Sequence, residues 1–163
     1  MSEFDKNIHI HYGPSQDEAQ HTELHREADS LGKYALELRL YSDEGMLKQN
    51  VKEFVNEFMR TSASECFNHG ADLIGHIKSF VKVGDKSILF SMVDDRIPTN
   101  IQDQVQVMMF SEAELVLHVI VHGIWDDTVR ECTLRILPEI AQKWGIKYDV
   151  LADHTSDSRH HCQ

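Results

Sequence analysis

The sequence predicts an α+β fold, in which a mostly antiparallel sheet carries two amphipathic helices packed on one face. Three observations lead to this expectation. Several short segments alternate apolar and polar residues, as half-buried strands do. Two longer segments repeat apolar residues at the spacing of an amphipathic helix. Short turn signals between some of the strands favour hairpins, and hairpins pair strands in the antiparallel sense.

A strand and a helix are expected first. Three leucines alternate with charged residues in YALELRLYS, residues 34–42, which predicts a half-buried strand. The next segment predicts a helix that begins at a cap on Ser42 or Asp43 and ends at Gly70. Its buried stripe is expected to consist of Leu47, Val51, Phe54, Val55, Phe58, Ser62 and Cys66.

Two hairpins are expected next. Residues 72–95 read as two strands joined by a turn at Gly84 and Asp85. Residues 96–104, RIPTNIQDQ, are expected to form a loop. The segments VQVMMF and LVLHVIVHGI then predict a second hairpin, joined near the residues SEAE.

A second helix and a last strand complete the order. The helix is expected from about Asp127, with Thr128 and Glu131 forming a capping box. Pro138 should kink or split this helix, because proline removes a backbone donor and crowds the preceding turn. The helix should end at Gly145, before a short strand in IKYDVLA. Its buried stripe is expected at Val129, Cys132, Ile136, Leu137, Ile140 and Trp144.

The resulting order is strand, helix, two hairpins, helix and strand. This order is a ferredoxin-like pattern with an extra strand pair, and likeness at the level of the fold implies no function by itself. One α+β domain is expected over residues 33–153, since 163 residues suit a single core. A flexible polar N-terminal arm is expected over residues 1–32, and a polar C-terminal tail over residues 154–163.

Composition excludes several classes of protein. The formal net charge of −11 disfavours nucleic acids and anionic membrane surfaces as partners, because both attract clustered lysine and arginine. No apolar run reaches the length of a membrane span, and the first residues lack the apolar core of a signal peptide. Three cysteines without close spacing form no disulfide framework. We therefore expect a cytoplasmic protein.

The candidate site lies on the sheet face away from the helices. Alternation in residues 115–122 places four apolar side chains on one face, and His118 and His122 on the other. The same reasoning places His76 and Lys78 on that second face. Glu37 and Arg39 of the first strand should join them there.

Three interpretations of these histidines stay open. They belong to a half-solvated surface or a subunit interface, or they hold a divalent transition metal such as Zn²⁺, Ni²⁺ or Co²⁺, or they serve as a general acid or base. As metal ligands we name His76, His118 and His122, since imidazole is the commonest ligand of such ions. His118 and His122 lie about 13 Å apart along a strand, so only one of them can share an ion with His76. The third ligand would come from another strand or from the termini, where His9, His11, His21 and His25 have chelating spacing.

The leading functional expectation is a small binding protein for a transition metal or a metal-containing cofactor. The alternative is a self-associating structural or regulatory module, and an enzyme of unknown class comes third, because no nucleophile or oxyanion motif accompanies the histidines. The mixed face leaves Phe80, Val116 and Ile120 exposed. A homodimer or a higher oligomer is therefore expected. Cys66 and Cys132 fall on the buried stripes of the helices and are expected to be inert thiols of the core.

Overall fold

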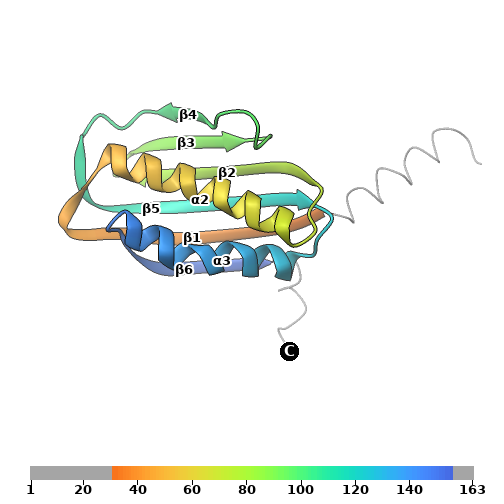
Figure 1. Cartoon of the computed structure of the whole chain (residues 1–163). Coiled ribbons are helices and arrows are strands. Elements are labelled where there is room, and N and C mark those ends of the chain that lie inside the picture. Colours follow the sequence, from red (N-terminus) through yellow and green to blue (C-terminus); the bar gives the residue numbers. More distant parts are fainter. Residues whose placement is uncertain (1–30, 156–163) are drawn as a thin grey trace, which may run out of the picture.

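The computed structural model describes residues 31–155, which form six strands and two helices (Figure 1). In chain order the elements are β1 (Leu31–Leu47), α2 (Lys48–Asn68), β2 (Leu73–Val83), β3 (Lys86–Met92), β4 (Asn100–Asp103), β5 (Met109–His122), α3 (Asp126–Lys143) and β6 (Lys147–Thr155). Leu31 and Thr155 both lie in strands, so the sheet slightly overlaps the expected arm and tail. Residues 1–30 and 156–163, which hold most of the expected arm and tail and the histidines named there, lie outside the described residues.

The six strands form one antiparallel sheet in the order β4-β3-β2-β5-β1-β6. The helices α2 and α3 lie side by side across one face of this sheet (Figure 1). The expected α+β class, with a mostly antiparallel sheet and two helices on one face, is confirmed. The ferredoxin-like detail stays a prediction.

The core fills the space between the helices and the sheet. The expected alternation in β1 and β5 is confirmed, since Leu36, Leu38, Leu115 and Leu117 are fully buried beneath the helices. Phe54 and Phe58 of α2 pack onto them with their rings stacked. Burying apolar side chains between two layers is the main stabilising contribution of such a fold.

The start of α2 differs from the expectation. Strand β1 continues to Leu47, so Ser42 and Asp43 lie in the strand and cap no helix. The strand persists because, beyond an irregularity after Tyr41, Met46 again pairs with β5. Leu47 is the N-cap residue of α2 and is 48 % exposed, so its expected place in the buried stripe was wrong.

The second expected hairpin was wrong. Strand β5 runs without a break through the residues SEAE, because Glu112 and Glu114 pair with β1 there. Strand β4 occupies part of the expected loop and pairs with β3 at the edge of the sheet. The first hairpin, β2 and β3 around Gly84, is confirmed.

Helix α3 begins earlier than expected and is not split. Its N-cap residue is Trp125, so Thr128 lies inside the first turn and the expected capping box was wrong. Asp126 instead lies at the N-terminus of the helix, where its Oδ1 accepts a hydrogen bond from the backbone N of Lys33 (2.8 Å). Pro138 lies inside the helix on its exposed side, where the backbone carbonyl that loses its partner can bind water.

Candidate histidine site on the open face of the sheet

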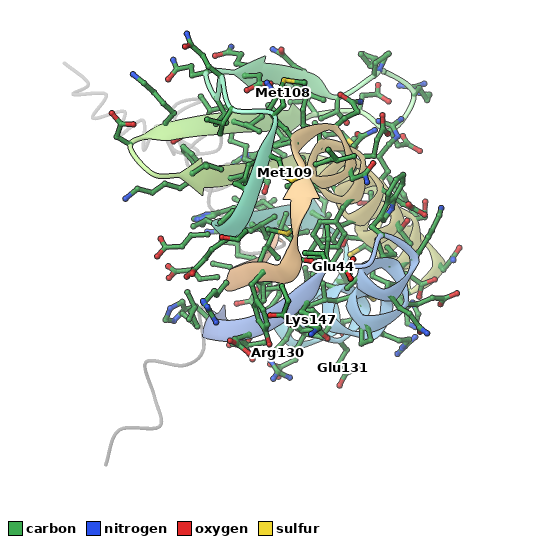
Figure 2. All side chains as sticks on the ribbon, turned by 90° about the vertical axis from the view of Figure 1, so that its left-hand side faces the viewer. Glu44, Met108, Met109, Arg130, Glu131 and Lys147 are labelled. Carbon is green, nitrogen blue, oxygen red and sulfur yellow. The ribbon has the colours of Figure 1, made fainter. Side chains whose placement is uncertain are left out.

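We call the sheet face away from α2 and α3 the open face. In Figure 2 the helices lie on one side of the sheet, and the side chains of the open face project from the other. His118 and His122 lie on this face, because the alternate residues Leu117, Val119 and Val121 are buried beneath the helices. The structure therefore places the pair on the face that the alternation of β5 predicts.

An irregularity in β2 positions His76. The pairing with β5 shifts between Ile74 and His76, at Gly75. A Cβ atom at Gly75 would lie 3.1 Å from Ile120, so a larger residue here would push the two strands apart by a few tenths of an ångström. The shift also turns Leu73 outward, to 57 % exposed, although regular alternation from the buried Ile77 would place Leu73 on the face beneath the helices. Ile74 is buried in its place.

His76 lies between the two histidines of β5. It is paired directly with Ile120, so His118 and His122 are its two diagonal neighbours across the strands. Diagonal neighbours of this kind are about 7–8 Å apart, within reach of long side chains. His76 can therefore meet either histidine of β5, whereas those two are too far from each other to share one ion.

A fourth histidine lies on the same face. His154 of β6 is paired with Ala35, and Ala35 is paired in turn with His118. His154 falls in the tail expected from the sequence, because nothing in the sequence shows how far β6 extends or in which register it pairs. His69, the fifth histidine among residues 31–155, lies at the end of α2, where its ring contacts the Glu65 carbonyl oxygen (2.9 Å) and Arg135 (3.2 Å).

Charge divides the open face into two ends. The end with the four histidines, which we call the histidine end, also carries Lys33 and Lys78. At the opposite end Arg39 forms ion pairs with Glu112 (2.7 Å) and Asp149 (3.1 Å). Arg39 therefore shares the open face with the histidines, as expected, but lies at its opposite end.

The surroundings of His76 favour its neutral form. Burial lowers the pKa of His76 below its usual value, and the nearby charge of Lys78 and then His118 lower it further. A neutral imidazole keeps a lone pair free for a metal ion or a proton. His76 can therefore act chemically as a ligand or as a base.

The described residues supply at most part of a metal site. Among residues 31–155, no three side chains of histidine, cysteine, aspartate or glutamate are arranged to hold one ion. Cys66 and Cys132 lie buried between the helices, and burial raises the pKa of the Cys66 thiol to about 12. These thiols are therefore protonated and remote from the open face.

A hollow borders the histidine end. It has a volume of about 320 Å³ and lies over β2, β3 and β4, with Lys78 at its margin. Phe80 and Leu89 give it apolar walls, and Asn100 and Gln102 add polar ones. This hollow could not be predicted from the sequence, because it depends on the pairing of β4 with β3.

No family model, curated protein or solved structure matches this chain. Within residues 31–155, neither helix is long and apolar enough to cross a membrane.

Proposed function

We propose that this protein binds a divalent transition-metal ion, Zn²⁺, Ni²⁺ or Co²⁺, or a cofactor that contains one, through histidines of the open face. The observation that carries the proposal is the position of His76 between His118 and His122. Two of these imidazoles would be the first ligands, His76 together with either partner. The lowered pKa of His76 supports this role, because a ligating ring must be deprotonated.

The remaining ligands would come from the two ends of the chain. Leu31 is paired with His122, and Thr155 follows His154, so both ends leave the sheet at the histidine end. A tetrahedral zinc site needs three or four protein ligands, one or two more than this face supplies. The segments beyond the sheet carry six histidines and one cysteine: His9, His11, His21, His25, His160, His161 and Cys162.

Calorimetric titration of the untagged full chain with each ion tests this proposal. The wild type should bind one of the ions more tightly than about 1 mM. His76→Ala should weaken metal binding by at least about tenfold, and so should either His118→Ala or His122→Ala. Even residues that only hydrogen-bond to a metal ligand change the metal affinity by about this much when they are removed. Circular dichroism should show that each variant keeps the fold.

The matched control is His69→Ala. His69 is the described histidine off the open face, so its loss should leave the affinity unchanged. A double variant, His21→Ala with His25→Ala, asks whether the N-terminal segment supplies a ligand. If the wild type and all the variants bind alike, or if none binds, the histidines have no role in metal binding.

Self-association through the open face is the second candidate function. The observation that favours it is Phe80, which is 44 % exposed and lies directly between Leu89 and Val116. An exposed aromatic ring in an apolar row is typical of a surface that another chain covers. The occupant would be a second copy, which makes the protein a homodimer or a higher oligomer.

Two finer assignments also belong to this proposal. A cytoplasmic location is supported by the free thiols of Cys66 and Cys132, because reducing compartments keep thiols unpaired. The ferredoxin-like assignment is supported by the order β6-β1-β5-β2, to which β3 and β4 are added at one edge.

A further inference from the structure

The histidine end carries positive charge without a counter-charge among the described residues. Within residues 31–155, the ammonium groups of Lys33 and Lys78 form no ion pair, and no carboxylate occupies the rows of the open face that contain the four histidines. At the other end Arg39 forms ion pairs with two acidic side chains, and Lys82 lies opposite Glu114 in the strand pairing of β2 with β5. The face is therefore charge-balanced at one end only.

The segment that precedes β1 has the opposite charge and begins at this end. Residues 1–30 contain seven acidic and two basic side chains. Leu31, where the described chain starts, is paired with His122 at the histidine end. An acidic segment is thus tethered beside an uncompensated basic surface, which raises its local concentration there.

The tether is long enough for specific contacts. Leu31 and Lys78 are separated by two strand spacings across the sheet and about four residues along it, roughly 16 Å. The seven residues from Leu24 to Leu31 span up to about 23 Å when extended. Leu24 can therefore reach the hollow beside Lys78, whose walls include Phe80 and Leu89.

We propose that residues 21–30 of this chain dock across the histidine end of the open face. Glu23 and Glu27 oppose Lys78 and Lys33, and Leu24 occupies the hollow lined by Phe80. The occupant is a segment of the same chain, and its attachment is electrostatic and apolar. The proposal does not rest on the metal, although docking would also bring His21 and His25 towards the histidines of the sheet.

Carbodiimide cross-linking of the full chain tests this proposal, because the reagent joins carboxylates to amines that already touch. Metal is first removed with EDTA, the EDTA is dialysed away because its own carboxylates would react, and the linked peptides are identified by mass spectrometry. Links from Glu23 or Glu27 to Lys33 and Lys78 should be about fivefold more frequent than links to the control Lys143 on α3, the enrichment expected of exposed ion pairs. Raising the ionic strength should reduce this difference.

Variants and isotope mixing make the outcome decisive. In Lys78→Gln the links to Lys33 should also fall, whereas Lys82→Gln, at the balanced end of the same face, should leave them unchanged. A mixture of labelled and unlabelled chains should give links within single chains. Links spread evenly over all lysines, or links mainly between chains, would overturn the proposal. Because EDTA removes metal, loss of metal binding in the calorimetric test leaves this result unaffected.

Discussion

Arg130 and Asp153 join helix α3 to the outermost strand β6. The guanidinium donates from Nη2 to Oδ2 (2.7 Å) and from Nε to Oδ1 (3.1 Å) of the carboxylate. These hydrogen bonds are the main reason why the pKa of Asp153 lies below its usual value. The pair is partly exposed, so its contribution is that of a good surface ion pair, about 1 kcal/mol at most.

Asp153→Asn should reduce the free energy of unfolding at neutral pH and flatten its fall in acid. A carboxyl group whose pKa is lowered in the folded state stabilises the protein at pH values above its pKa in the unfolded state, about 3.9. This stabilisation is lost as the pH falls through the pKa of the folded state. Urea unfolding between about pH 6 and pH 3 measures both effects. Asp85→Asn, in the turn between β2 and β3, is the control. Equal acid dependence in the wild type and Asp153→Asn would contradict the prediction.

At the scale of elements, the start of β1 is held tightly beneath the start of α3. A side chain at Gly32 would lie 2.5 Å from the carbonyl oxygen of Ile124 and 2.8 Å from Val129. The hydrogen bond from Lys33 to Asp126 lies next to this contact. The junction holds the start of β1 in place at the histidine end, and so it bears on both proposals.

Gly32→Ala should therefore destabilise the protein. The added methyl group has no room, and forcing an extra carbon into a packed contact costs about 1–3 kcal/mol. The melting temperature should fall by several degrees, as measured by scanning calorimetry. Lys33→Ala, which changes the next side chain on the open face, should melt close to the wild type. An unchanged melting temperature in Gly32→Ala would show that the junction can relax.

At the scale of the whole molecule, one face of the sheet is packed and the other is not. The helices cover the first face, and the described chain leaves the second open (Figure 1). Exposed apolar side chains also gather where β1 ends and β5 begins, with Met108 and Met109 near the viewer in Figure 2. The two surfaces are distinct, so substitutions can separate their roles.

If a second copy rather than residues 21–30 covers Phe80, light scattering at high micromolar concentration should show a homodimer or a higher oligomer for the wild type. Phe80→Lys should shift the protein towards the monomer, because a charged side chain would be buried in the apolar row of the open face. Met108→Lys is the matched control, since Met108 is 66 % exposed at the end of the molecule. A wild type that is monomeric throughout would rule out self-association.

Local patterns were sufficient to predict the class of fold and the faces of its central strands. The alternation in β1 and β5, and the helical spacing in α2 and α3, reflect which side chains must leave water, and burial follows that pattern directly. The same alternation placed His118 and His122 on the open face. The turn at Gly84 was also readable, because the sequence between β2 and β3 is short.

Pairing partners and registers were decided only by the tertiary structure. The irregularity at Gly75, which places His76 between His118 and His122, exists because two strands distant in sequence approach closely. The continuity of β5 through SEAE depends in the same way on pairing with β1, including the ion pair of Arg39 with Glu112.

The sequence by itself thus determined the α+β class, the buried stripes and the presence of histidines on a second face. The tertiary structure decided that four histidines and two lysines share one end of that face. It also decided that the first and last described residues, Leu31 and Thr155, lie at this same end. The physical reason is that the burial of each side chain follows from the local pattern of apolar and polar residues. Strand order and register arise instead from contacts between segments far apart in sequence.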